Sequence, residues 1–136
     1  MILVLQTNLD DRVECWLVQK SKITGRMSRP QSFEKRVVPL VLIDQLMKDV
    51  KTTPQKLTGV AVVRGPGRFS GVRTGIIIGN LLGQELNIPV VGVVKKTALT
   101  DEQVQRVAAQ AESSARHTAV KPWYGKKPNI TKPKRR

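Results

Sequence analysis

The sequence has few of the side chains that most often build metal or nucleophilic sites. Among its 136 residues there are one cysteine, Cys15, and one histidine, His117. A single cysteine cannot form an internal disulfide, and this pair cannot supply the four ligands of a usual zinc site. Cys15 lies in an apolar run, residues 13–18, so we interpret it as a buried thiol in a reducing, cytoplasmic compartment.

Aromatic residues and acids are also scarce, and no hydrophobic run is long. The chain has two Trp, one Tyr and two Phe, so aliphatic side chains must fill the core of what its length indicates is a single domain. No run approaches the roughly 20 apolar residues of a membrane span, and the apolar start is too short for a signal peptide. The 24 Lys and Arg outnumber the 10 Asp and Glu, which gives a net charge of +14 and favours a polyanionic partner.

The pattern of apolar runs predicts an α/β fold with a mixed sheet. Strands are expected over residues 2–5, 13–18, 22–27, 59–63 and 90–94. Helices are expected over residues 37–50, 70–86 and 100–116. The last two strands are continuous apolar runs, which is typical of strands buried on both faces. In this order a β-meander joins parallel strands that are connected by crossover helices.

The composition changes near residue 118, which predicts a domain of residues 1–117 and an extended basic tail of residues 118–136. Residues 120–136 contain three prolines, seven Lys or Arg and no acid. Such a run is often only solvated, but aromatic side chains between cations can stack on bases while the cations contact phosphates. Docking of residues 123–125 on protein is a third interpretation. The candidate RNA-binding residues are Lys121, Trp123, Tyr124, Lys126, Lys127, Lys132, Lys134, Arg135 and Arg136.

A glycine-rich turn connects the strand at residues 59–63 to the following helix, and residues 60–75 read VAVVRGPGRFSGVRTG. Glycine tolerates a positive φ and proline presets a turn. Three arginines near the helix N-terminus would suit an anion, but the spacing matches no phosphate-binding motif, so we favour a structural turn. The residues of this signature turn are Gly65, Pro66, Gly67, Phe69, Ser70 and Gly71.

The first two predicted helices carry more apolar surface than one sheet face needs. In the second helix a glycine recurs at every fourth position, and Ile77 and Leu81 extend the apolar or glycine arc to about 260° of the helical wheel, against about 100° for a helix that covers a sheet. The two helices could bury each other, or they could form a protein interface in which the glycines allow a close approach. The candidate interface residues are Leu40, Ile43, Leu46, Met47, Gly71, Gly75, Ile78, Gly79, Leu82 and Gly83.

The glycine-rich turn resembles the Gly-Pro-Gly-Ser-Phe-Thr-Gly signature of the TsaB (YeaZ) family. Residues 38–46, VPLVLIDQL, and residues 87–93, NIPVVGV, are similar to two further segments of that family in the same order. The resemblance covers about residues 1–100. It implies one lobe of the ribonuclease-H-like fold of actin, Hsp70 and sugar kinases, and a subunit of the machinery that makes threonylcarbamoyladenosine in tRNA.

The resemblance also implies partners. In the TsaB family the two helices pack against the catalytic subunit, TsaD, and can pair with a second copy. The expected function is therefore a non-catalytic subunit that stabilises or activates a TsaD-like enzyme, reaches tRNA through that complex, and leaves ATP or ADP and metal to the enzyme. No catalytic residue, metal ligand, cofactor or membrane contact is expected in this chain.

Two departures from the family pattern bear on this expectation. The family commonly has an Asp on its first strand where this chain has Gln6, and an amide cannot act as a general base or an anionic metal ligand. We interpret Asp10 and Asp11 as turn residues rather than a metal pair. The family normally has a second lobe, so this chain looks like a minimal form. The rival hypotheses are a freestanding basic RNA-binding protein and a small ATPase of the actin-like class.

Overall fold

The computed structural model describes residues 1–67, 69–114 and 119–121. The strands are β1 (Ile2–Gln6), β2 (Arg12–Gln19), β3 (Lys22–Pro30), β4 (Gly59–Val63) and β5 (Val90–Val93). The helices are α1 (Pro39–Asp49), α2 (Phe69–Leu86) and α3 (Asp101–Glu112), with a short 3-10 helix at Pro54–Lys56. None of the helices in the described ranges has the length and apolar character to cross a membrane.

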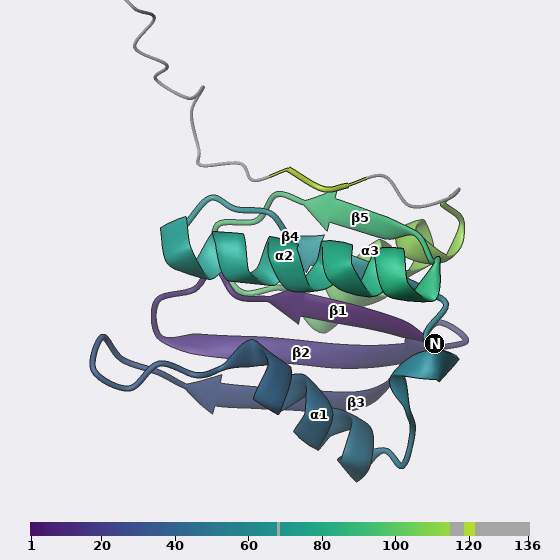
Figure 1. Ribbon diagram of the computed structural model, residues 1–136, viewed down its shortest axis with the longest axis horizontal. Coiled ribbons are helices and arrows are strands. Elements are labelled where there is room, and N and C mark those ends of the chain that lie inside the picture. Colours follow the sequence, from purple (N-terminus) through teal and green to yellow (C-terminus); the bar gives the residue numbers. More distant parts are fainter. Residues whose placement is uncertain (68, 115–118, 122–136) are drawn as a thin grey trace, which may run out of the picture.

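The five strands form one mixed sheet in the order β3-β2-β1-β4-β5 (Figure 1). β1, β2 and β3 are antiparallel neighbours, as the predicted meander requires, while β1, β4 and β5 run parallel. Leu3 lies in the centre of the sheet, opposite Leu17 of β2 and Val60 of β4. The predicted mixed sheet is therefore confirmed.

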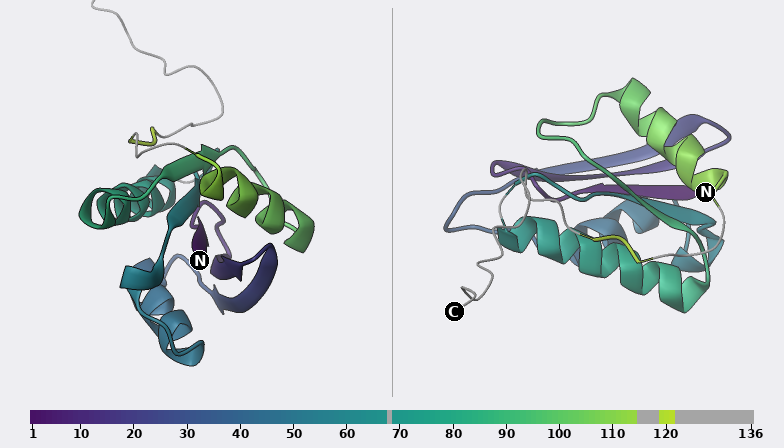
Figure 2. Two further views of the ribbon diagram at one scale, coloured as in Figure 1. Left: turned by 90° about the vertical axis from the view of Figure 1, so that its right-hand side faces the viewer. Right: turned by 90° about the horizontal axis from the view of Figure 1, so that it is seen from above.

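Helices cover both faces of the sheet, with α1 and α2 on one face and α3 on the other (Figure 2). Successive side chains of a strand point to opposite faces, so the apolar runs of β1 and β4 contribute to two cores. Leu3 and Leu5 pack under α1 and α2, and Ile2 and Val4 pack under α3. Every residue of β1 and β4 is buried, as the continuous apolar pattern of β4 predicts.

Local sequence signals fix the ends of the helices. α1 begins at Pro39, where proline has no backbone N–H to leave unpaired. α3 is preceded by Thr100, whose side chain accepts a hydrogen bond from the Gln103 N–H while the Gln103 side chain accepts one from the Thr100 N–H. α3 spans fewer residues than the predicted 100–116, and its buried side chains are Val104, Val107, Ala108 and Ala111.

Two strands differ from the sequence-based prediction. β3 continues to Pro30, three residues beyond the predicted end, because its pairing with β2 extends to Arg12. β5 was predicted to be buried on both faces, but only Val90 is buried and the other three residues are half-buried. The reason is topological: in the described sheet β5 lies at the edge and pairs with β4 alone, whereas β4 lies between two strands.

Candidate functional site

Gln6, the last residue of β1, links this strand to the segment that follows β5. Its side-chain Nε2 donates hydrogen bonds to Asn8 Oδ1 at 3.2 Å and to the Thr97 carbonyl oxygen at 2.9 Å. Its Oε1 accepts a hydrogen bond from the Leu99 N–H at 2.9 Å. Gln6 is fully buried, so these bonds satisfy an amide that has no contact with water. Gln6 therefore has a structural role, because it holds the end of β1 to residues 97–99.

Thr7 and Asn8 link the end of β1 to the glycine-rich turn. Asn8 Nδ2 donates to the carbonyl oxygens of Pro66 at 2.8 Å and Lys95 at 2.7 Å. The Thr7 hydroxyl donates to the Gly71 carbonyl oxygen at 2.6 Å, in the first turn of α2. The carboxyl ends of β1, β4 and β5 are thus tied together by side-chain hydrogen bonds to the backbone.

The glycines of the turn and of α2 allow this close approach. A Cβ on Gly67 would lie 2.5 Å from the Asn8 carbonyl oxygen, and a Cβ on Gly71 would lie 2.5 Å from the Thr7 carbonyl oxygen. These distances leave no room for a side chain. Gly65 has a φ of 123°, a conformation that L side chains rarely adopt, so the predicted structural role of the turn has a direct explanation.

The glycine stripe of α2 faces the sheet of this chain, so its prediction as a surface for a partner was wrong. A Cβ on Gly75 would collide with the Thr7 hydroxyl oxygen, and a Cβ on Gly79 would lie 2.8 Å from Val62 Cγ2. Gly83 is buried as well. The close approach that the stripe permits is to β1 and β4.

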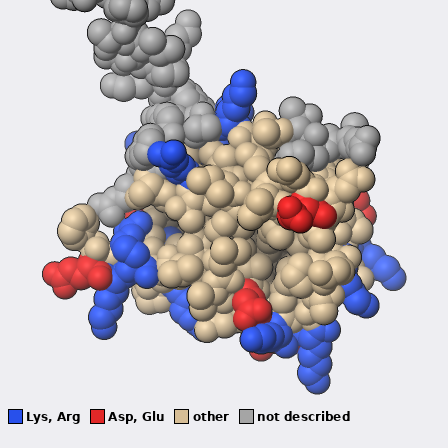
Figure 3. All heavy atoms as spheres, viewed as in Figure 1, with Lys and Arg blue, Asp and Glu red and all other residues tan. Residues whose placement is uncertain are grey.

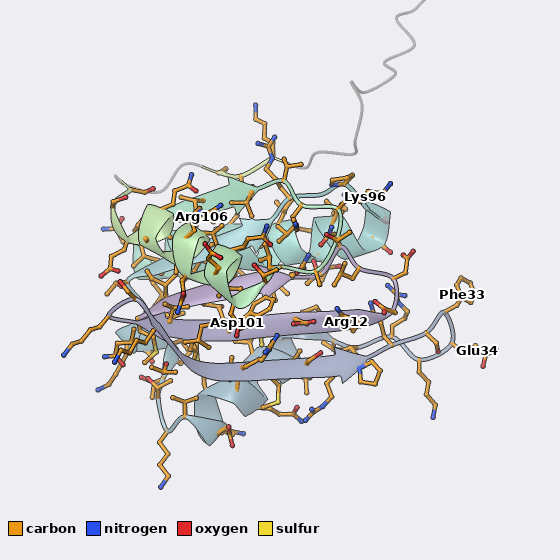
Figure 4. The ribbon with its side chains drawn as sticks, turned by 180° about the vertical axis from the view of Figure 1, so that it is seen from behind. Arg12, Phe33, Glu34, Lys96, Asp101 and Arg106 are labelled. Carbon is orange, nitrogen blue, oxygen red and sulfur yellow. The ribbon has the colours of Figure 1, made fainter. Side chains whose placement is uncertain are left out.

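A groove of about 460 Å³ lies beside the turn. Its charged lining residues are Asp10, Asp11, Arg12 and Lys96, and Figure 4 shows Arg12 and Lys96 at the same end of the sheet. Among the described residues no group of three or more His, Cys, Asp or Glu side chains could hold a metal ion. Arg64, one of the three arginines near the helix N-terminus, is not among the residues that line this groove, and its Nε donates to the Lys121 carbonyl oxygen at 2.9 Å.

Exposed aliphatic side chains gather on the outer side of α1 and α2. Leu40 and Val41 of α1 are 55% and 53% exposed, and Ile77 and Leu81 of α2 are each 55% exposed. We call these four residues the α1–α2 surface. Figure 3 shows this side of the molecule as a largely uncharged area, with most of the Lys and Arg side chains at its margins.

A groove of about 450 Å³ runs between the two helices. It is lined by Leu40, Ile43 and Met47 of α1, by Leu82 of α2 and by Pro54. Asp44 and Lys48 also border it and form an ion pair of 2.9 Å with each other. The helices therefore do not bury each other completely, which was the alternative to an interface.

The structure divides the predicted interface residues into two groups. Leu40 is exposed and Leu82 is half-buried. The side chains of Ile43, Leu46, Met47 and Ile78 are at most 6% exposed and belong to the core under the two helices. Val41, Ile77 and Leu81 were not in the predicted set, although the width of the apolar arc indicated that part of it must face away from the sheet.

Cys15 is fully buried in β2, as predicted, and forms no disulfide. Burial, with a smaller contribution from the carboxylate of Glu14, raises the pKa of the thiol from 9.0 to about 12, against a small opposing effect of Arg29. The thiol therefore stays protonated at neutral pH. A protonated thiol is a weak nucleophile, which agrees with a structural role.

Residues 31–122 match the model of the family described as TsaD: tRNA N6-adenosine threonylcarbamoyltransferase. The chain belongs to this family, as a TsaB-like member. Two curated relatives show the likeness to TsaB, since both bear the name tRNA threonylcarbamoyladenosine biosynthesis protein TsaB.

The TsaB protein of Buchnera aphidicola is 32% identical over 94 residues, which are 68% of this TsaB-like chain and 43% of the relative. The TsaB protein of Bacillus subtilis is 36% identical over 58 residues, 43% of this chain and 24% of the relative. The chain thus spans less than half the length of these relatives. The family membership that the sequence motifs predicted is therefore confirmed.

Solved structures support the fold. YeaZ from Pseudomonas aeruginosa superposes on this TsaB-like chain with a TM-score of 0.61 and 22% identity. The superposition covers 68% of this chain and 43% of the YeaZ chain. A second structure, described as an uncharacterized protein with similarity to peptidase YEAZ from Pseudomonas aeruginosa, gives a TM-score of 0.57 at 24% identity over 68% of this chain and 42% of its own. Both support the predicted mixed α/β fold.

Most of the predicted RNA-binding residues lie outside the described ranges. Lys121 is described and exposed. The other eight, Trp123, Tyr124, Lys126, Lys127, Lys132, Lys134, Arg135 and Arg136, fall within residues 122–136, which the structure does not describe. The domain boundary at residue 118 stays a prediction. Val120, which that prediction assigned to the tail, packs against the core of the domain.

Proposed function

We propose that this TsaB-like chain is a non-catalytic subunit that pairs, through the α1–α2 surface, with a TsaD-like enzyme of threonylcarbamoyladenosine biosynthesis. The observation that carries the proposal is the group of four aliphatic side chains, each more than half exposed, on two adjacent helices. Exposed aliphatic residues scattered singly are ordinary on protein surfaces, but several on two helices that share an apolar groove are typical of a partner site. A second copy of the chain is the competing occupant.

The hydrogen bonds at the carboxyl end of β1 support the non-catalytic part of the proposal. In this position Gln6 has no carboxylate to take a proton or bind a metal ion, and its amide is already hydrogen-bonded on both sides. ATP or ADP and metal are accordingly assigned to the TsaD-like subunit. The small actin-like ATPase remains the rival hypothesis.

Co-expression of the chain with a TsaD-like subunit from the same genome, followed by size exclusion, tests the pairing. The two chains are expected to elute together, and Leu81→Glu is expected to separate them, because it places a charge in the apolar contact. The matched control is Val94→Glu, which puts the same charge on an aliphatic residue that is 49% exposed outside the α1–α2 surface. ATP turnover is expected only in samples that contain the TsaD-like subunit.

Two outcomes would contradict the proposal. Co-elution that survives Leu81→Glu would place the contact elsewhere on the chain. A Leu81-dependent dimer of the chain alone, with no binding to the TsaD-like subunit, would assign the surface to self-association instead.

A further inference from the structure

Residues 119–121 lie alongside α2 and β5, far in sequence from both (Figure 2). On α2 the polar contact is made by the side-chain amide of Asn80. Asn80 Nδ2 donates a hydrogen bond to the Val120 carbonyl oxygen at 3.0 Å, and the Val120 N–H donates to Asn80 Oδ1 at 2.8 Å. Both backbone polar groups of Val120 are therefore satisfied by a single amide, as a neighbouring strand would satisfy them.

The side chain of Val120 fits a gap in the edge strand. A Cβ on Gly92 of β5 would lie 2.7 Å from Val120 Cγ1 and 2.8 Å from Arg64 Cδ, so the absence of a side chain at Gly92 makes room for both. Val120 is half-buried there and packs against the core under α2. Arg64 adds a third hydrogen bond, from its Nε to the Lys121 carbonyl oxygen at 2.9 Å.

We propose that Asn80, Gly92 and Arg64 form a docking site for an extended segment, and that its occupant is the chain's own residues 119–121. Recognition of this kind combines backbone hydrogen bonds, which tolerate many sequences, with one pocket that selects a side chain. The gap over Gly92 selects a small branched aliphatic residue. The site lies at the edge of the sheet where β5 has no neighbouring strand among the described residues.

Docking also fixes the point from which the basic sequence continues. The Arg64 side chain holds Lys121 by its carbonyl oxygen. The backbone N–H of Arg64 donates a hydrogen bond to the Val93 carbonyl oxygen at 2.8 Å, at the end of β5. Residues 122–136, which follow directly, hold six Lys or Arg and no acid. Figure 1 shows residues 119–121 on the side of α2 away from α1, so the docked segment leaves the α1–α2 surface uncovered.

Hydrogen exchange of the Val120 amide, measured by NMR on the full chain, tests the proposal. In the unaltered chain this N–H is expected to exchange at least about ten-fold more slowly than in an unstructured peptide. Asn80→Ala removes its acceptor and is expected to abolish that protection while the amides of α2 stay protected. Gly92→Ala, which leaves Asn80 in place but fills the gap, is expected to have the same effect on Val120. Gln84→Ala, an exposed amide one turn further along α2, is the matched control and should change nothing.

Three results would overturn the proposal. The first is exchange of Val120 in the unaltered chain at the rate of an unstructured peptide. The second is protection that persists in both Asn80→Ala and Gly92→Ala. The third is protection that disappears on dilution together with a dimer, because the occupant would then be a segment of a second copy. None of these results depends on the pairing with a TsaD-like subunit.

Discussion

Thr7 explains, at the scale of single residues, why glycine recurs in the first half of α2. Its carbonyl oxygen lies 2.5 Å from the position that a Cβ on Gly71 would take, and its hydroxyl oxygen would collide with a Cβ on Gly75. The same hydroxyl donates a hydrogen bond to the Gly71 carbonyl oxygen. Each glycine lowers helix stability by roughly 1 kcal/mol relative to alanine, and the contact between β1 and α2 is what this cost permits.

Gly75→Ala is expected to lower the free energy of unfolding by about 1–3 kcal/mol, because overpacking outweighs the gain in helix propensity. In a Thr7→Ala background the same substitution should cost less, since the hydroxyl that a Cβ would meet is absent. Urea unfolding of the four chains of this double-mutant cycle gives the coupling between the two positions. Additive losses would show that Thr7 is not the obstacle.

At the scale of elements, the sequence predicted every strand and α-helix of the described fold but not the direction in which α2 faces. A helical wheel gives the angles between residues, and an arc of about 260° contains more than one sector that could cover a sheet. Which sector does so depends on the partners, here Thr7 and Val62, which no local pattern contains. Ile77 and Leu81 point outward as a result.

Gly79→Leu is therefore expected to destabilise the domain itself, by about 3 kcal/mol or more, rather than to act on partner binding alone. The reason is that Val62, which the new side chain would meet, is completely buried in the sheet. Thermal unfolding measures the loss. Leu81→Ser, an outward-facing change on the same helix, is the control and should alter stability by no more than about 0.5 kcal/mol. If the Gly79→Leu chain were as stable as the unaltered one, the glycine stripe would not pack against the sheet and could face a partner instead.

At the scale of the whole molecule, the α1–α2 surface and the docked residues 119–121 lie on different sides of α2. The composition of residues 120–136 predicted an extended basic tail. No local pattern predicted where residues 119–121 would attach to the domain. Asn80 and Val120 are separated by 40 residues and are brought together only by the return of the chain past α3. A truncation that keeps the docked residues therefore begins after Lys121.

Deletion of residues 122–136 is expected to weaken tRNA binding by the complex with a TsaD-like subunit and to flatten its salt dependence. The deletion removes six Lys or Arg and no acid, and each cation that meets a phosphate contributes about 0.7 to 0.9 to the slope of log K against log salt, so contacts by all six would lower the slope by about 4 to 5. Size exclusion of the truncated complex is the control, because the α1–α2 surface is intact. A salt slope that does not change would assign the segment to protein contacts, and substitution of Trp123 and Tyr124 in the full chain would then be expected to weaken the complex instead.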